Sequence, residues 1–118
     1  MDIIIFGAPR TKKNGMMKTS NGLIQSAAYR KYERDSMLQI FASMRRQIDT
    51  PVNVQCLYYT PTLGKVDLCN LLAATCDILV KSGVLADDNS RIVAGHDGSR
   101  VLYDKDNPRA EIYIRPIS

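Results

Sequence analysis

Two spacings of apolar residues alternate along this chain, and they separate the expected strands from the expected helices. Residues 2 to 6 form a short β-branched and aromatic run that a glycine closes, which predicts a short buried strand. From 52 to 58 every second residue is apolar or aromatic, as in a strand with one covered face. The same alternation from 110 to 114 predicts a last strand, which begins after the chain-breaking pair Asn107-Pro108.

Two other segments repeat apolar residues at the spacing of an amphipathic helix. The first covers residues 27 to 48, after Ser26 as the expected N-cap and before Pro51. The second covers residues 68 to 82 and is apolar on most sides, with Gly83 as its expected C-terminal cap. A narrow polar stripe interrupts this second helix, and such a stripe faces solvent, a cleft or a partner. The stripe consists of Asp67, Asn70, Asp77 and Lys81.

The segments between these elements carry turn signals. Residues 8 to 22 contain a proline, two glycines and several lysines without periodicity, which predicts a long loop. Residues 92 to 96 and 100 to 103, joined through an Asp-Gly pair, predict a hairpin. The resulting order is β-α-β-α-β-β-β. We therefore expect an α/β fold for residues 1 to 118, as a single small domain with a mixed β-sheet packed by two main helices.

Composition narrows the class of protein. A hydrophobic content of 45% and a charged content of 24% in 118 residues are typical of one globular domain. No apolar run approaches the roughly 18 residues that span a bilayer. The N-terminal segment carries an acidic residue and lacks the basic start of a signal peptide. We therefore expect a cytoplasmic protein with no membrane partner.

The cysteines point to reduced thiols. Cys56, Cys69 and Cys76 form no CxxC pair and are odd in number, so mostly buried free thiols are expected and a disulfide framework is not. A zinc site built from these thiols and His96 is conceivable, but the four residues lack the paired spacing of such sites.

The formal net charge of +4 is concentrated near one end of the chain. Residues 1 to 46 hold nine Lys and Arg against three Asp and Glu, a surplus of six. This asymmetry is consistent with a polyanionic partner and equally with a solvated basic face. The candidate contacts to a polyanion are Arg10, Lys12, Lys13, Lys18, Arg30, Lys31 and Arg34.

Two acidic positions have both a simple and a functional interpretation. Asp67 alone is the N-cap of helix 68 to 82, and Asp87-Asp88 alone is part of a turn. The carboxylates can meet if residues 83 to 88 carry the chain back to the start of that helix. Clustered carboxylates repel unless a cation neutralises them, and oxygen ligands suit Mg²⁺ or Mn²⁺. An acidic metal cluster with a basic loop fits phosphodiester chemistry.

These segments resemble a known family. "VDLCNLLAATCDILVKSGVLADDNSRIV", followed by "DKDNPRAEIYI", is similar to the signature of the RusA family of Holliday junction resolvases, small bacterial and phage endonucleases. The opening strand, Gly7-x-Pro9 and the lysine-rich loop also resemble family members, so the similarity covers nearly the whole chain. The positions that match the family's central box are Asp67, Asn70, Leu71, Ala74, Asp77, Leu79, Gly83, Asp87, Asp88 and Ile92.

The resemblance implies a homodimer of α/β subunits that binds branched DNA, namely four-way junctions, and cuts paired strands symmetrically with a bound Mg²⁺ or Mn²⁺. By position, Asp67 and Asp88 would be catalytic metal ligands, with Asp87 alongside them. Asn70 would brace the site. The resemblance also implies that Lys12 and Lys13 contact phosphates.

Two residues depart from the family pattern inside this site. Cys69 stands where a second catalytic aspartate is expected, and Ala73 stands where a lysine is expected. A thiol is a poor ligand for Mg²⁺. Three functions follow, in this order: a metal-dependent junction endonuclease of recombination and repair, a DNA-binding dimer that cuts slowly or not at all, and a phage-type protein-interaction module on the same fold.

Overall fold

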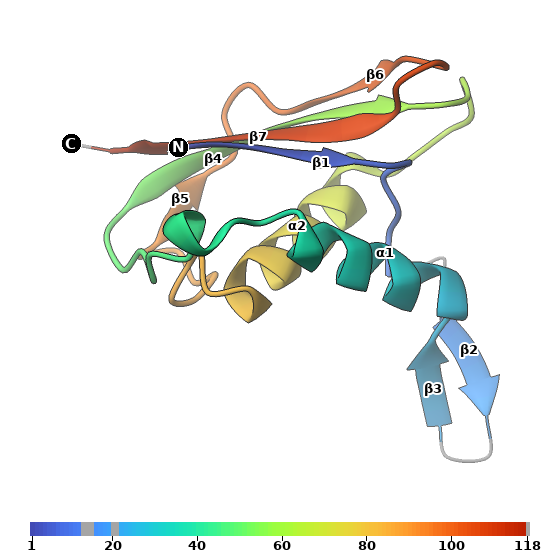
Figure 1. Ribbon diagram of the computed structural model, residues 1–118, viewed down its shortest axis with the longest axis horizontal. Helices are drawn as coiled ribbons and strands as arrows, with labels where there is room; N and C mark the ends of the chain where they lie inside the picture. The colour runs from blue at the N-terminus through green and yellow to red at the C-terminus, as the bar shows by residue number, and fades with distance from the viewer. Residues whose placement is uncertain (13–15, 20–21, 118) are drawn as a thin grey trace.

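The computed structural model describes residues 1–12, 16–19 and 22–117, and it contains one mixed sheet with both long helices on the same face (Figure 1). The helices are α1 (Ala27–Leu38) and α2 (Leu68–Lys81). The strands of the sheet are β1 (Asp2–Phe6), β4 (Val52–Thr60), β5 (Val93–Gly95), β6 (Arg100–Tyr103) and β7 (Arg109–Pro116). The expected α/β fold with a mixed sheet and two main helices is therefore confirmed.

The order of the strands follows from how the chain crosses the sheet. β7 lies between β1 and β4 and is antiparallel to both. Helix α2 carries the chain back after β4, so the next two strands run parallel to β4. β5 pairs with the start of β4 near Val52, and β6 pairs with its end near Thr60. Both short strands thus occupy one edge of β4, one after the other.

The core lies between the sheet and α2, where the two apolar periodicities meet. Every second residue of β4 is buried, and Ala110, Ile112 and Ile114 of β7 are buried beside them. Leu79 of α2 is fully buried in the same cluster. Burial of one such aliphatic side chain contributes about 1.5–3 kcal/mol. Gly83 follows α2 with a φ of 83°, as the predicted C-terminal cap requires.

The predicted loop over residues 8 to 22 is wrong in part. Residues Met16–Thr19 form β2 and residues Gly22–Gln25 form β3, and these strands pair antiparallel with each other. Figure 1 shows this hairpin extending away from the sheet and from α1. A two-stranded ribbon that extends away from the sheet needs no apolar alternation, so its sequence lacks the signal used for the other strands.

The predicted helix over residues 27 to 48 is too long. Helix α1 ends at Leu38, and a 3-10 helix, Ala42–Met44, follows after Phe41, whose side chain is 65% exposed. The side chain of Gln39 fixes this end, because it accepts from the N–H of Phe6 at 2.7 Å and donates to the Phe6 carbonyl at 3.1 Å. The chain then joins the segment after α2, where Ile48 forms a bridge with Leu85.

The predicted hairpin over residues 92 to 103 is also wrong, although its turn exists. β5 and β6 do not pair with each other, because Asn53 and Gln55 of β4 bond the turn between them. Asn53 Oδ1 accepts from the Asp97 N–H at 2.8 Å, and Gln55 Nε2 donates to the Gly98 carbonyl at 3.2 Å. The chain is therefore held along β4 and keeps its direction.

The first strand differs from the expectation in its exposure. β1 was expected to be buried, yet Ile4 and Phe6 are 43% and 56% exposed on the face that carries no helix. Only its alternate residues Ile3 and Ile5 enter the core. Among the described residues, no helix is long and apolar enough to cross a membrane.

Candidate active site at the first turns of helix α2

Asp67 is the N-cap of α2. Its backbone is extended, with φ −84° and ψ 110°, and its Oδ1 accepts from the N–H of Asn70 at 3.3 Å. The capping interpretation is therefore confirmed, and a cap of this kind contributes about 1 kcal/mol to stability. Asn70 lies half-buried in the same turn. A second role for Asp67 as a metal ligand stays a prediction.

Asp87 organises the turn in which it lies. Its Oδ1 accepts from the N–H of Asp88 at 2.8 Å, and its Oδ2 accepts from Asn89 Nδ2 at 3.0 Å. The bond from the Asp88 N–H, followed by that from Asn89, lowers the pKa of Asp87, because both favour the charged carboxylate. Both oxygens of Asp87 are thus engaged within its own turn.

Asp88 faces a hollow that lies against α2. The hollow has a volume of about 410 Å³. The turn after α2 does return to the helix, as the sequence suggested, and it brings Asp88 to the residue that replaces the expected aspartate, Cys69. Asp67 and Asp87 are not among the lining residues. These are Cys69, Leu72, Ala73, Cys76, Asp88, Ser90, Val93 and His96.

His96 and Cys76 form a pair in this hollow. The sequence analysis grouped His96 with the three thiols as a conceivable zinc site, and the hollow contains His96, Cys69 and Cys76 but not Cys56. His96 Nδ1 lies 2.8 Å from the carbonyl oxygen of Val54, so Nδ1 carries the proton and donates. The other ring nitrogen, Nε2, lies 3.9 Å from Cys76 Sγ. Cys69 and Cys76 lie seven residues apart on one helix, a spacing of two turns that could have indicated a shared face.

Burial controls the chemistry of Cys76. Desolvation raises the pKa of its thiol to about 11, and the nearby Asp88 carboxylate adds to this rise. The thiol is therefore protonated at neutral pH. A protonated buried thiol is neither a nucleophile nor a preformed metal ligand.

The donors in this hollow do not fit Mg²⁺ or Mn²⁺. Several oxygen ligands suit these ions, whereas the hollow offers one carboxylate and the Ser90 hydroxyl beside two thiols and an imidazole. Across residues 1–12, 16–19 and 22–117, no group of three or more His, Cys, Asp or Glu side chains is arranged to hold a metal ion. The side chains at Cys69 and Ala73 supply neither the oxygen nor the positive charge that the resemblance implies.

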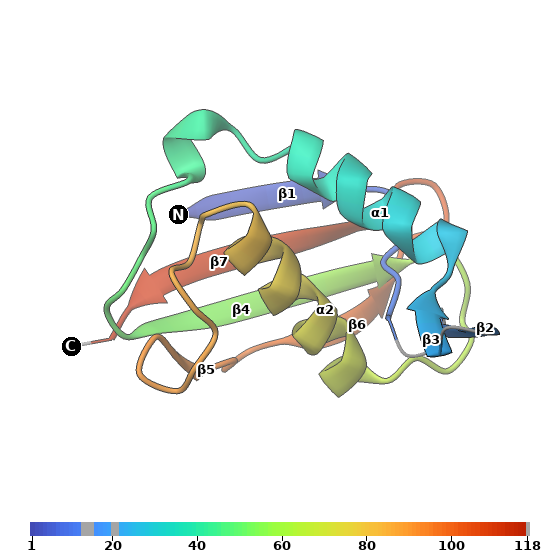
Figure 2. The same cartoon turned by 90° about the horizontal axis from the view of Figure 1, so that it is seen from below.

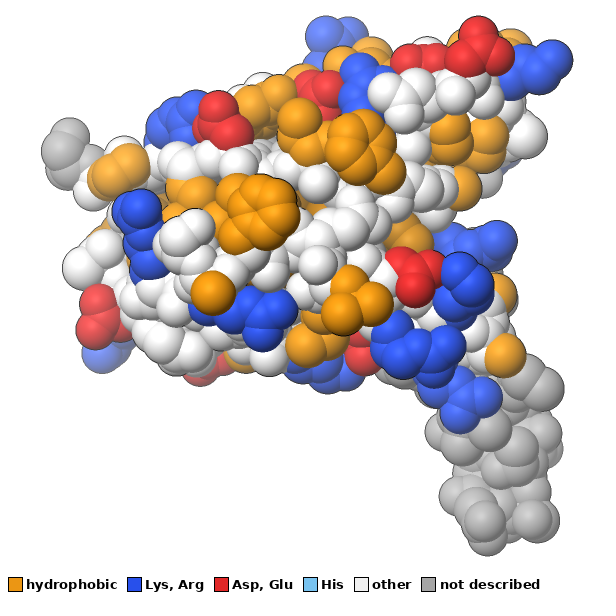
Figure 3. Space-filling model, viewed as in Figure 1, with side chains coloured by type: hydrophobic (Ala, Val, Ile, Leu, Met, Phe, Trp, Pro, Cys, Tyr) orange, Lys and Arg blue, Asp and Glu red, His pale blue; other side chains and the backbone are white. Residues whose placement is uncertain are grey.

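The predicted polyanion contacts lie mainly on one side of the molecule. Figure 3 shows Lys and Arg side chains gathered beside the start of α1, where Arg30, Lys31 and Arg34 are exposed. Lys12 instead forms an ion pair with Asp77 Oδ2 of α2. Of the remaining candidates, Arg10 is exposed, Lys18 lies on β2, and Lys13 lies outside the described residues.

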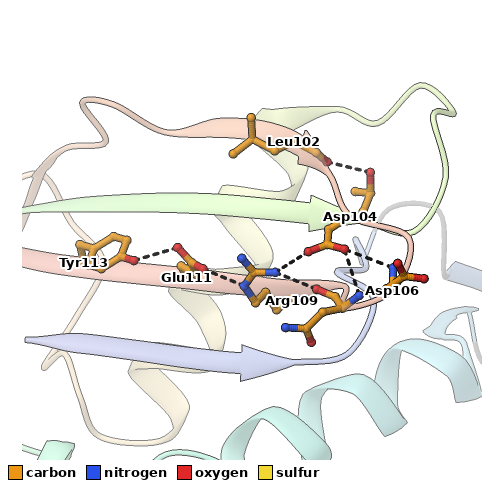
Figure 4. A network of polar contacts seen from close by, with 8 residues as sticks. Leu102, Asp104, Asp106, Arg109, Glu111 and Tyr113 are labelled. Atoms are coloured by element: carbon orange, nitrogen blue, oxygen red, sulfur yellow. Dashed lines mark hydrogen bonds and ion pairs between the residues drawn. The ribbon is translucent and has the colours of Figure 1, made fainter.

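The Asn-Pro-Arg motif near the C-terminus serves the sheet and not the hollow. Figure 4 shows Arg109 bonded to Asp104 at 3.0 Å and to Glu111 at 2.7 Å. Its guanidinium also stacks over the ring of Tyr59, 3.9 Å from the centroid. Arg109 therefore joins the turn after β6 to β7 and β4, on the face opposite α2.

Comparison with known proteins gives one finding that bears on this site. A family model described as "Endodeoxyribonuclease RusA" matches residues 7–115, which include α2, the turn that follows it and the Arg109 motif. No curated protein sequence matches the chain significantly.

Proposed function

Because this chain belongs to the RusA family of endodeoxyribonucleases, we propose that it binds four-way DNA junctions as a homodimer and cuts them slowly. The match to the family model supports the nuclease activity in this proposal. The matched residues include those that line the hollow with Asp88 and the basic segments around α1. We propose that cleavage is slow because Cys69 lies in the same hollow.

Support for DNA as the partner comes from charge. Arg30, Lys31 and Arg34 lie within about one helical turn of one another on the exposed part of α1, and Arg10 lies in the loop after β1. Only Lys31 of these four has an ion pair in the described residues, with Asp35 at 2.6 Å. Cations on one side attract the phosphate backbone and release its counterions. A branched duplex presents backbone on several arms at once.

Support for slow cleavage comes from the chemistry of the hollow. Asp88 is the one carboxylate in its lining, and the neighbouring positions on α2 are a thiol, Cys69, and a methyl group, Ala73. Neither group stabilises a developing negative charge on a phosphate, which is the main electrostatic requirement of phosphoryl transfer. Asp88 can still orient or deprotonate an attacking water, as a general base does.

Support for a dimer comes from the open face of the sheet. Ile4 and Phe6 of β1 are exposed there, at 43% and 56%. Both helices lie on the other face (Figure 1). A second copy packed on this face would cover these side chains and place two hollows on one junction, which symmetric cutting requires. A stable interface of this kind buries at least about 1,000 Å² in total.

The test uses a synthetic four-way junction and a linear duplex of the same arms. We expect the protein to bind the junction more tightly, with an affinity that falls steeply with salt, and to cut it slowly in Mg²⁺ or Mn²⁺. Asp88→Asn should bind equally and cut less. Equal affinity for the two DNAs would refute junction recognition, and no binding to either would favour the protein-interaction module.

A further inference from the structure

The hollow against α2 gathers sulfur, nitrogen and oxygen donors from three separate segments. Cys76 lies on α2, Asp88 in the turn that follows the helix, and His96 after β5. Figure 2 shows the chain after α2 running back beside that helix to reach β5. Zn²⁺ binds thiolate, imidazole and carboxylate groups together, whereas Mg²⁺ takes oxygen ligands. The fold therefore places a donor set of the zinc type where the family resemblance implies a magnesium site.

Cys76 and His96 have nearly the separation of two ligands of one zinc ion. Cys76 Sγ lies 3.9 Å from His96 Nε2. In a tetrahedral site with Zn–S of about 2.3 Å and Zn–N of about 2.1 Å, the sulfur and the nitrogen are about 3.6 Å apart. The pair would need to close by only a few tenths of an ångström around an ion. Cys76 is 6% exposed but lines the hollow, so an ion would reach its thiol from there.

The orientation of His96 is an independent observation that points to a metal ligand. Its Nδ1 lies 2.8 Å from the carbonyl oxygen of Val54, a fully buried residue of β4. A neutral imidazole that donates from Nδ1 has an unprotonated Nε2, which is the form that binds a cation. Histidines that bind metals almost always donate their other ring N–H to a backbone carbonyl, a carboxylate or water. The bond to Val54 thus fixes His96 as a ligand before any ion binds.

Helix geometry selects Asp88 over Cys69 as the third ligand. Residues seven apart on a helix have Cα atoms about 10.5 Å apart, whereas two thiolates on one zinc ion are about 3.8 Å apart. The short side chains of Cys69 and Cys76 cannot bridge that difference. Asp88 is near enough to Cys76 to contribute to the raised pKa of its thiol, and it is exposed in an irregular turn. The described residues do not already place three such side chains around one point, so the Asp88 carboxylate must turn toward the pair when the ion binds.

We propose that the hollow binds one Zn²⁺ ion through Cys76 Sγ, His96 Nε2 and the Asp88 carboxylate, with a water molecule as the fourth ligand. The ion replaces the proton of the thiol, which is released to solvent. Leu72 and Val93 line the same hollow, and apolar side chains around a metal limit the access of water. The ion joins α2 to the two segments that follow it. The site needs no DNA, so it goes beyond the proposed function.

The first experiment titrates the wild type and Cys69→Ser with Co²⁺, which replaces Zn²⁺ in such sites and reports its ligands by absorption. Both proteins should bind one ion and develop a thiolate-to-cobalt charge-transfer band with the strong visible bands of a tetrahedral site. Zn²⁺ should displace the cobalt, and excess Mg²⁺ should not. Cys69→Ser is the matched control, because it removes the other thiol of the hollow. A charge-transfer band that is absent from both proteins, or lost in Cys69→Ser, would overturn the proposal, as would displacement by Mg²⁺.

The second experiment removes each ligand and measures Zn²⁺ affinity by competition with an indicator. Cys76→Ser and His96→Asn should each weaken binding more than about 100-fold, because losing only a partner that orients a ligand already costs about 10–100-fold. His96→Asn places an amide N–H near the position of Nδ1, so it can keep the bond to Val54 while it loses Nε2. Asp88→Asn should weaken binding about tenfold, since a neutral amide replaces a charged ligand. Wild-type affinity in a variant that circular dichroism shows to be folded would overturn the ligand set; if a variant does not fold, the cobalt spectra decide.

Bound zinc also has a consequence for junction cleavage, and this last test rests on the proposed function. As a zinc ligand, the Asp88 carboxylate can no longer orient or deprotonate an attacking water. Zn²⁺ at a saturating concentration should therefore slow cleavage in Mg²⁺ by the wild type and not by His96→Asn. Equal inhibition of both proteins would overturn this competition for Asp88. If the wild type cuts no junction even without zinc, the proposed function fails, and the cobalt spectra still decide whether the hollow binds zinc.

Discussion

Asp88 and Cys69 line one hollow although 19 residues separate them in the sequence, because the turn after α2 returns to the first turns of that helix. The carboxylate of Asp88 thus shares a hollow with a thiol at the position where the resemblance implies a second carboxylate. We therefore expect the side chain at position 69 to determine whether the site responds to Mg²⁺.

The first prediction concerns Cys69→Asp. An added carboxylate beside Asp88 increases repulsion, so the protein without metal should lose about 0.5–1 kcal/mol of unfolding free energy. Mg²⁺ should then stabilise the variant by about 1.4 kcal/mol at ten times its dissociation constant, and junction cleavage should rise. Thermal unfolding with and without Mg²⁺ measures this. Cys69→Asn, which has the same shape without charge, should show no metal response; loss of stability in Cys69→Asp without a metal response would mark Cys69 as a packing residue.

The second prediction separates the two roles of Asp67. Asp67→Ala removes the N-cap and should cost about 1 kcal/mol in urea unfolding. Asp67→Asn keeps an oxygen that accepts from the Asn70 N–H, so its unfolding free energy should stay within a few tenths of the wild type. Cleavage by Asp67→Asn should persist if capping is the whole role. Lost cleavage at wild-type stability would instead assign the carboxylate to the chemistry.

The third prediction concerns the ion pair between Lys12 and Asp77. Both side chains are about one-third exposed, so breaking the pair should cost only about 0.2–1 kcal/mol. Asp77→Asn should release Lys12 for a phosphate, tighten junction binding and steepen the salt slope by up to about 0.9. Asp106→Asn removes an equal charge from an exposed turn and serves as the control. The same slope for both variants would show that Lys12 does not reach DNA.

The fourth prediction concerns the loss of unfolding free energy at acid pH, which should depend on Arg109. Bonds from Arg109, then from the Asn107 N–H, lower the pKa of Asp104 below 3.8. Burial would raise the pKa of Glu111, but bonds from Arg109 and the Tyr113 hydroxyl outweigh it, and the net pKa is below 4.5. A carboxyl group whose pKa is lower in the folded protein than in the unfolded chain stabilises the fold at pH values above its unfolded pKa. This stabilisation is lost as the pH falls through the folded pKa. Arg109→Leu should therefore destabilise the protein more at pH 7 than at pH 3 in urea unfolding; an equal effect at both would contradict the ion-pair account.

The fifth prediction orders the three thiols by reactivity. Burial raises the pKa values of Cys56 and Cys76 to about 12 and about 11, whereas Cys69 is exposed. At pH 8 an alkylating reagent should modify Cys69 first, since the thiolate is the reactive form and access is open. Mass spectrometry of the native protein should show one fast adduct. Cys69→Ser should abolish it, and a fast adduct in that variant would place another thiol at the surface.

Sequence pattern predicted the elements whose side chains pack on the core. The alternation in β4 and β7 and the helical repeat in α2 persist because each buries one face or most of its surface. The sequence pattern could not predict the places where single side chains redirect the backbone. Gln39 ends α1 by bonding Phe6, and Asn53 holds the Asp97 turn, so a helix was predicted too long and two parallel strands were predicted as a hairpin.

The residues of the candidate site were also predicted only in part. The residues around α2 and the acidic turn pointed to Asp67, Asp87 and Asp88, but spacing cannot say which carboxylate faces a cavity. Local bonds engage Asp87 in its turn and Asp67 at the helix cap, and Asp88 alone lines the hollow. The sequence analysis grouped His96 with the thiols but not with Asp88, because the place of His96 depends on a contact with Val54, 42 residues away.

The division of one sheet edge between β5 and β6 has a consequence for how this protein behaves at high concentration. An edge strand with free N–H and C=O groups can template pairing with another chain. Here the edge beside β4 is broken into strands of three and four residues, with a bonded turn between them. No long ladder can form on that side. Within the main sheet, strand-to-strand aggregation would have to begin at β1, the opposite edge, where Asp2 and its partner Arg115 place charges at the end of the strand.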